Sequence, residues 1–158
     1  MARPPTRNKQ VYFLGAGFSR AAGLPNTAEL LTEVDALAET HTAWGVSKDM
    51  SSRLAEAYKY FYPERGNGFR PDVVDFFSVL TTYAAIDRGG LPDGFGDSAL
   101  LADLRFAIAQ VLCQRTKALN EAQLRSAEPD LNEMIRPGNV IITSNWDGVV
   151  ERLCEARG

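Results

Sequence analysis

The sequence has few of the residues that build disulfide frameworks and metal sites. It contains two cysteines, Cys113 and Cys154, and a single histidine, His41, in 158 residues. The cysteines lie far apart and match no Cys-x-x-Cys or Cys/His spacing, so we expect no metal and no disulfide. Cys113 is expected to pack inside a helix, and Cys154 to be an inert helical thiol. Such cysteine usage is typical of a reducing compartment and predicts a cytoplasmic protein.

A strong positive charge and long apolar runs are also missing. Lys plus Arg number 17 and Asp plus Glu number 20, for a net charge of -3 at pH 7. Arg53, Arg65 and Arg70 form no dense basic patch in the sequence, so we expect no direct contact with nucleic acid. No apolar run approaches the roughly 20 residues of a membrane-spanning helix, and we expect no membrane partner.

The composition that is present is that of an ordinary globular chain. Hydrophobic residues make up 45% and charged residues 23% of the sequence, and the length is close to that of one domain. Residues 1–9 contain two prolines and three basic residues and are expected to form a flexible arm. Residues 10–158 are expected to form the folded domain.

Hydrophobic patterning predicts two strands and several helices. Residues 10–14 and 139–143 are apolar without polar alternation, which is typical of parallel strands buried on both faces. A helix is predicted after Asn26, whose spacing to Glu29 is that of a capping box. Further helices are predicted at residues 48–61, 71–86 and 98–124, with a last one beginning near Trp146 or Asp147.

This order of elements predicts an α/β fold in which a helical insertion separates two strands of a parallel sheet. Two strands alone do not complete such a sheet, because their edges and apolar faces stay uncovered. We therefore expect the sheet to be completed by sequence beyond these residues or by a partner chain. The alternative is a small helical domain with a two-stranded ribbon.

A glycine-rich loop follows the first strand. Gly15 and Gly17 lie where the strand is expected to pass into a helix, and glycines at such a place let the phosphates of a ligand approach the backbone. Ser19 adds a hydroxyl donor and Arg20 a charge. Arg20 also stands where the common dinucleotide-binding fingerprint has its third glycine, so that fingerprint is not met. A turn that serves only strand-to-helix packing is the alternative.

Two motifs resemble those of the sirtuin (SIR2) superfamily. GAGFS at residues 15–19, followed by Gly23 and Pro25, resembles the GAGxSxxxGxP signature, and TSNWD at residues 143–147 resembles the TxNxD motif. Each follows a strand, where open α/β sheets bind ligands, so we expect both to face one cleft. The resemblance implies a Rossmann-like sheet that binds NAD without a metal. It assigns NAD binding to Gly15, Ala16, Gly17, Phe18, Ser19, Pro25 and Asp147, and catalysis to Asn145.

The second motif carries the expected chemistry. The resemblance implies that the Asn145 carboxamide holds the ribose hydroxyls or a water, and that Asp147 binds the nicotinamide carboxamide. The plainer interpretations are a turn or N-cap side chain for Asn145 and a charge at a helix N-terminus for Asp147. Trp146, between them, is expected either to line the nicotinamide end of the cleft or to pack in the core.

The departures from the superfamily pattern favour one branch. Sirtuin deacylases continue the first motif as PDFR, whereas this chain has PNTA at residues 25–28, which disfavours deacylation. The segments at residues 23–26 and 71–80 resemble SIR2-like domains of prokaryotic antiphage effectors, which cleave NAD and release nicotinamide. The resemblance thus implies an NAD hydrolase (NADase) of antiviral defence that acts as a homo-oligomer or with a partner defence protein.

The general base of that family is a histidine after the TxNxD motif, and no histidine follows Asn145 here. His41 is expected to be a surface residue at a helix end. Two hypotheses therefore stay open. In the first, the chain is an NAD hydrolase whose histidine lies downstream of these residues; in the second, it is an inactive sensor module that binds NAD or an ADP-ribose derivative.

Overall fold

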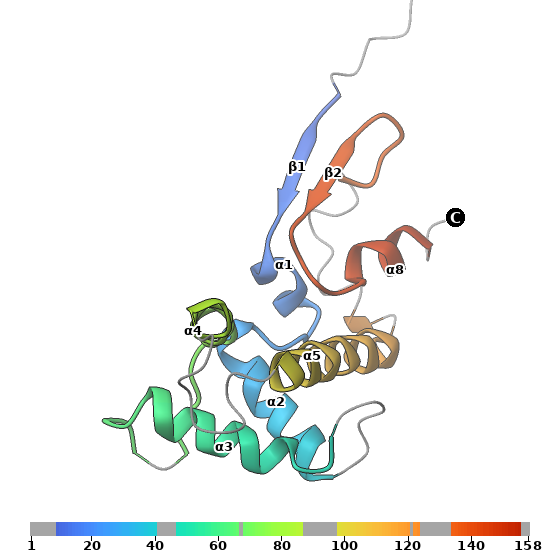
Figure 1. The fold of residues 1–158 in the computed structure, drawn as a ribbon. Helices are drawn as coiled ribbons and strands as arrows, with labels where there is room; N and C mark the ends of the chain where they lie inside the picture. Colours follow the sequence, from blue (N-terminus) through green and yellow to red (C-terminus); the bar gives the residue numbers. More distant parts are fainter. Residues whose placement is uncertain are drawn as a thin grey trace, which may run out of the picture. The chain divides into compact units, whose positions relative to one another are not determined.

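The computed structural model describes residues 9–40, 47–66, 68–86, 98–120, 122–123 and 134–155. His41 and residues 1–8 of the predicted arm lie outside these ranges. The fold is mixed α/β and mostly helical (Figure 1). Its elements are β1 (Val11–Leu14), α1 (Ala16–Ala21), α2 (Thr27–Glu39), α3 (Met50–Phe61), α4 (Val73–Ile86), α5 (Ser98–Ala118), β2 (Val140–Thr143) and α8 (Val149–Glu155).

The chain divides into two compact units. The first, here called the strand unit, comprises Met1–Leu24 and Thr116–Gly158. The second, here called the helical unit, is the continuous segment Pro25–Arg115. None of the described helices is long and apolar enough to cross a membrane.

The strand unit contains a two-stranded parallel sheet. β1 and β2 pair in register from Val11 opposite Val140 to Leu14 opposite Thr143, which confirms the two predicted strands and their parallel direction. The ladder begins where the Val140 N–H donates to the Gln10 carbonyl at 2.9 Å. Beyond the strands, the Ser144 N–H donates to the Leu14 carbonyl at 3.2 Å, so the pairing continues into the segment that carries the second motif.

The sheet is not buried on both faces, contrary to the expectation from its apolar sequence. Val11, Phe13, Val140 and Ile142 share one face and are exposed, with Phe13 exposed by 77%. The alternate residues of both strands are half-buried. The reason is that a sheet of two strands has only its own short unit to cover it, so the apolar pattern is present without the layers that would bury it.

α1 ends in a Schellman motif, a hydrogen-bonded helix end that needs a left-handed residue. The Leu24 N–H donates to the Ser19 carbonyl at 3.2 Å, and the Gly23 N–H donates to the Arg20 carbonyl at 2.9 Å. Gly23 has a φ of 91°, which favours glycine. The glycine before the proline of the first motif therefore has a structural role in stopping α1.

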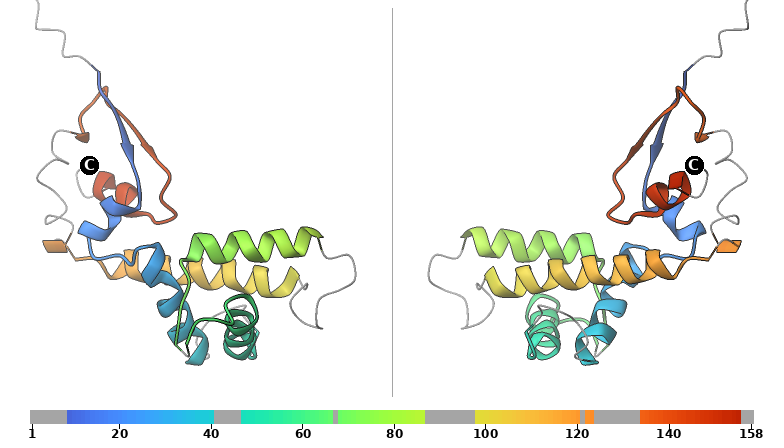
Figure 2. Two further views of the ribbon diagram at one scale, coloured as in Figure 1. Left: turned by 90° about the vertical axis from the view of Figure 1, so that its left-hand side faces the viewer. Right: turned by 90° about the vertical axis from the view of Figure 1, so that its right-hand side faces the viewer.

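The helical unit packs four helices around an apolar core. α2 begins with the predicted capping box: the Glu29 N–H donates to Asn26 Oδ1 at 2.9 Å, and the Asn26 N–H donates to Glu29 Oε2 at 3.1 Å. α4 and α5 run alongside each other (Figure 2), and Arg105 of α5 lies over the ring of Phe77 of α4. The most deeply buried side chains of the unit include Leu31, Val34, Leu54, Val73, Phe76 and Leu104.

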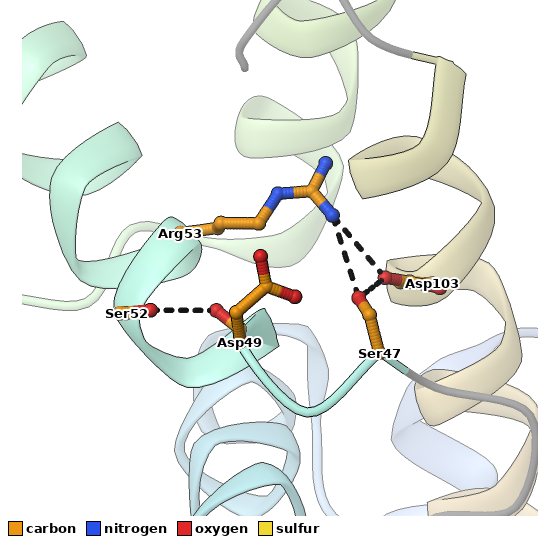
Figure 3. A network of polar contacts seen from close by, with 5 residues as sticks. All are labelled: Ser47, Asp49, Ser52, Arg53 and Asp103. Carbon is orange, nitrogen blue, oxygen red and sulfur yellow. Dashed lines mark hydrogen bonds and ion pairs between the residues drawn. The ribbon is translucent and has the colours of Figure 1, made fainter.

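A polar network joins α3, its preceding turn and α5 (Figure 3). Asp103 accepts a hydrogen bond from the Ser47 hydroxyl, and Arg53 Nη1 lies 3.5 Å from Asp103 Oδ2. Arg53 and Asp103 have side chains exposed by only 16% and 14%. Within the described residues, Arg53 Nη2 is buried without a hydrogen-bond partner.

Local polar contacts explain where helix bounds differ from the prediction. α5 ends at Ala118 rather than continuing to residue 124. Asn120 and Gln123 exchange hydrogen bonds of 3.1 and 2.9 Å between backbone N–H groups and side-chain oxygens, which is a second capping box. α8 begins at Val149 because Asp147 Oδ1 accepts the Val149 N–H at 3.1 Å, which holds Asp147 ahead of the helix.

Candidate functional site

The two sequence motifs meet at the carboxyl ends of β1 and β2. Leu14 and Thr143 are opposite each other in the parallel register, so the glycine loop and the TSNWD segment leave the sheet at the same edge. Asn145 Nδ2 donates a hydrogen bond of 2.7 Å to Ser19 Oγ, which joins the motifs directly. Both residues belong to the strand unit. The two motifs are therefore adjacent, and their expected position facing one ligand cleft stays a prediction.

Asn145 is held in one orientation and has an unused acceptor. Its backbone N–H donates to Thr143 Oγ1 at 3.1 Å, and its side-chain nitrogen is engaged by Ser19. Asn145 Oδ1 is buried and has no hydrogen-bond partner among the described residues. Leaving a buried acceptor unsatisfied costs about 1–3 kcal/mol. Exchanging the amide oxygen and nitrogen does not remove the deficit, because Ser19 Oγ partners only one end of the carboxamide.

Ser19 acts on the site through Asn145. Its side chain is 3% exposed, and its Oγ accepts the Asn145 amide hydrogen. The hydroxyl proton remains available as a donor. The predicted direct contact of Ser19 with a ligand stays a prediction, whereas its contact with Asn145 is a role that sequence reasoning missed. No local sequence signal indicates it, because the two residues are 126 positions apart.

Gly15 and Gly17 are not explained by the packing of the described residues. Gly15 has a φ of -113° and a ψ of -178°, an extended conformation open to any residue. A Cβ built at Gly15 or at Gly17 meets no atom within 4 Å. The N-cap residue of α1, Gly15, has no side chain that could cap the helix, and the first amides of a helix have no acceptor within it. The chain therefore leaves open space beside backbone donors at this loop.

The remaining predicted residues of the first motif lie in different settings. Phe18 is half-buried in α1, and the backbone of Ala16 begins that helix. Pro25 is half-buried and is the first residue of the helical unit, directly before the α2 N-cap Asn26. Its assignment to NAD binding stays a prediction.

The second motif supplies two side chains besides Asn145. Trp146 is 59% exposed, so of its two alternatives packing in the core is wrong, and lining the nicotinamide end of a cleft stays a prediction. Asp147 is half-buried and caps the start of α8 through Val149, which is the plainer of its two interpretations. Its contact with a nicotinamide carboxamide stays a prediction.

A further unsatisfied polar atom lies in the same unit. Thr116 is buried, and its Oγ1 has no hydrogen-bond partner in the part of the chain that the structure describes. A Cβ built at Gly148, which follows the TSNWD segment, would lie 3.6 Å from Thr116 Cγ2. No sequence pattern connects Thr116, near the end of α5, with the second motif.

The described residues contain no group of three or more His, Cys, Asp or Glu placed to hold a metal ion. Cys113 and Cys154 are both free and exposed. The expectation that Cys113 packs against its neighbours is therefore wrong, since it lies on the open side of α5.

Comparison with known proteins adds no relative: no protein-family model, no curated protein and no solved structure matches this chain. The resemblance to the SIR2 superfamily therefore depends on the two motifs alone. The geometry that bears on it is the hydrogen bond between Ser19 and Asn145, which brings one residue of each motif together.

Proposed function

We propose that the strand unit is a SIR2-like NAD-binding site and that the protein cleaves NAD+ to release nicotinamide in bacterial antiphage defence. The observation that carries the proposal is the buried, unpartnered Oδ1 of Asn145, held by Ser19 of the glycine-loop motif. This oxygen can accept a hydrogen bond, so it suits a ligand whose hydroxyl groups donate one.

The chemistry of NAD suits the two parts of the site. The open backbone at Gly15 and Gly17 suits the diphosphate, since oriented N–H groups bind phosphate oxygens. A ribose hydroxyl, or a water that attacks the ribose, would donate to Asn145 Oδ1. Cleavage of the bond between nicotinamide and ribose passes through an oxocarbenium-like state, so a fixed carboxamide aids it by holding the ribose or the water in place.

Hydrolysis also requires a group that takes a proton from water. The only histidine of the sequence is His41, which lies between β1 and β2 in the chain, ahead of the second motif and outside the described residues. A second candidate function follows from that observation: a module that binds NAD or an ADP-ribose derivative and signals its occupancy without turnover. Under the hydrolase function, this 158-residue chain alone turns over NAD about 10²- to 10⁴-fold more slowly than a site with its base; under the second function, it does not turn over NAD.

Calorimetric titration with NAD, beside a nicotinamide-release assay, tests the proposal. Gly17→Val places a branched side chain in the open space beside the loop, so it abolishes NAD binding by steric exclusion. Asn145→Ala keeps the loop and retains binding, while nicotinamide release by a catalytically competent form, extended to supply the base, falls about 10²-fold or more. Ala21→Val is the matched control, because it adds the same side chain at an exposed position of α1.

The outcomes separate the candidates. NAD binding by Gly17→Val equal to that of the unmodified chain, or full turnover by a folded Asn145→Ala variant, would show that the site is assigned wrongly. Tight binding of NAD without cleavage, in a form extended beyond these residues and supplied with its partner proteins, would favour the sensor module over the hydrolase.

A further inference from the structure

The helical unit contains a cavity that belongs to neither sequence motif. It lies at the C-terminal end of α3 and under the loop that follows, and its volume is about 330 Å³. This is the size of a small-molecule site, for which cavities of about 300–1,000 Å³ are usual. The side chains that define its chemistry are Tyr58, Lys59, Tyr62, Arg65, Phe69 and Arg70.

Two of the lining residues, Tyr58 and Arg70, belong to a partly buried charge cluster. Arg70 Nε bonds to Asp35 Oδ2, and the Tyr58 hydroxyl donates to Asp35 Oδ1 at 3.4 Å. Arg70 Cζ also lies 4.9 Å from the centre of the Tyr58 ring. Burial raises the pKa of the Asp35 carboxyl, although its hydrogen bond and ion pair with Arg70 oppose this. The charge of Arg70 is thus paired with Asp35 within the protein.

The other cations of the cavity have no acidic partner. Within the described part of the chain, Lys59 and Arg65 form no ion pair, and both are exposed. Arg65 Cζ lies 5.3 Å from the centre of the Phe69 ring, which leaves its N–H groups free to bind a ligand. None of the described residues that line the cavity is acidic. The cavity therefore favours an anion.

Aromatic rings also line the cavity. Tyr62 and Phe69 have ring centres 5.4 Å apart, and a Cβ built at neighbouring Gly66 meets no atom within 4 Å. The Tyr62 hydroxyl is buried without a hydrogen-bond partner among the described residues, and burial raises its pKa. Aromatic faces beside unpaired cations suit a ligand that combines a flat ring with negative charge.

We propose that this cavity binds a small phosphate ester that carries a flat ring, the chemical class of a nucleoside phosphate. Arg65 and Lys59 bind the phosphate, and the ring lies against Phe69 and Tyr62. The site is independent of the proposed NAD site, because its residues all belong to the helical unit.

Calorimetric titration of the full chain with adenosine monophosphate, adenosine, ribose 5-phosphate and inorganic phosphate tests the ligand class. Adenosine monophosphate binds at least tenfold more tightly than the other three, because it alone offers both groups. Equal binding of adenosine would overturn the role of the cations. Equal binding of ribose 5-phosphate or inorganic phosphate would overturn the role of the rings, and no binding of adenosine monophosphate would overturn the site.

Variants locate the binding and separate it from the NAD site. Arg65→Gln and Lys59→Gln each weaken binding of adenosine monophosphate about tenfold, the scale of one charge-assisted hydrogen bond. Arg105→Gln is the matched control, because Arg105 lies over Phe77 at 5.9 Å in the same unit but outside the cavity. Gly17→Val retains the binding. If Gly17→Val abolishes it and Arg65→Gln does not, the ligand occupies the glycine loop and this proposal is wrong.

Discussion

At the scale of single residues, the contact between Ser19 and Asn145 does the most to define the strand unit. The two side chains are 126 positions apart and share a buried hydrogen bond of 2.7 Å. Ser19 is 3% exposed, so no water takes its place easily. The bond uses the amide nitrogen of Asn145, and Asn145 Oδ1 is left without a hydrogen-bond partner among the described residues.

Removing the Ser19 hydroxyl leaves a second polar atom of Asn145 unpaired. We expect Ser19→Ala to lower the free energy of unfolding by about 1–3 kcal/mol, the cost of an unsatisfied buried group. Urea unfolding followed by circular dichroism measures the change. Ser144→Ala is the control, because Ser144 is exposed and next to Asn145. Equal stability of the two variants would mean that the hydrogen bond contributes nothing.

Burial of Asp35 makes the free energy of unfolding depend on pH, and it determines the sign of that dependence. The pKa of this carboxyl in the folded protein is raised above 3.8, its ordinary value. At a pH between 3.8 and the raised pKa, the folded protein therefore binds more protons than the unfolded chain. The free energy of unfolding therefore falls as the pH rises through that interval. Asparagine does not titrate, so the stability of the unmodified protein relative to Asp35→Asn falls over the same interval and is level above it.

Urea midpoints of the two proteins, measured from pH 3 upward, test this sign. A relative stability that rises with pH would show that the ion pair with Arg70 outweighs the burial of Asp35.

At the scale of secondary-structure elements, the glycines of the first motif divide into two kinds. Gly23 ends α1 at a φ of 91°, where a side chain is strained, whereas Gly17 lies inside α1 with open space at its Cβ position. Gly23→Ala is expected to lower the free energy of unfolding by about 1–2 kcal/mol. Gly17→Ala is expected to raise it by about 0.5–1 kcal/mol, since alanine favours a helix, and to weaken NAD binding.

Thermal unfolding beside NAD titration tests the pair. A stabilising effect of Gly23→Ala would contradict the Schellman motif. A Gly17→Ala variant that is both more stable and unchanged in NAD binding would remove the reason for a glycine at that position.

The sequence predicts the elements where the determining contact is local. Asn26 and Glu29 are three residues apart, and their capping box starts α2 where it was expected. Asn120 and Gln123 form a similar box, although the helix predicted over residues 98–124 extends across them. The contact between Ser19 and Asn145 depends on the register of β1 and β2. The cavity depends on Arg65 and Arg70 lying beside residues near the end of α3. Neither arrangement can be predicted from the spacing of residues in the sequence.

At the scale of the whole molecule, the exposed sheet predicts association. Phe13 is 77% exposed beside Ile142, and both strands of a two-stranded sheet have an unpaired edge. We expect the chain to self-associate or to bind a hydrophobic dye in solution. Phe13→Lys should reduce both by placing a charge on the open face. Sedimentation and dye fluorescence measure the change, with Phe106→Lys as control because Phe106 is 57% exposed on α5.

A sharp monomer that binds no dye would contradict this expectation and favour a self-sufficient small domain. If Phe106→Lys reduced association and dye binding equally, the apolar surface responsible would not be confined to the sheet but would include the helical unit.

The parallel register also sets the order in which the chain takes shape on the ribosome. Val11 pairs with Val140, so β1 leaves the exit tunnel long before its partner has been translated. At about 5–20 residues per second, the delay is roughly 6 to 26 s. The continuous helical unit, Pro25–Arg115, is complete within that time, whereas β1 must wait as an unpaired apolar strand. The newborn chain therefore presents Phe13 to chaperones, or to neighbouring nascent chains, before it can form the edge that carries Asn145.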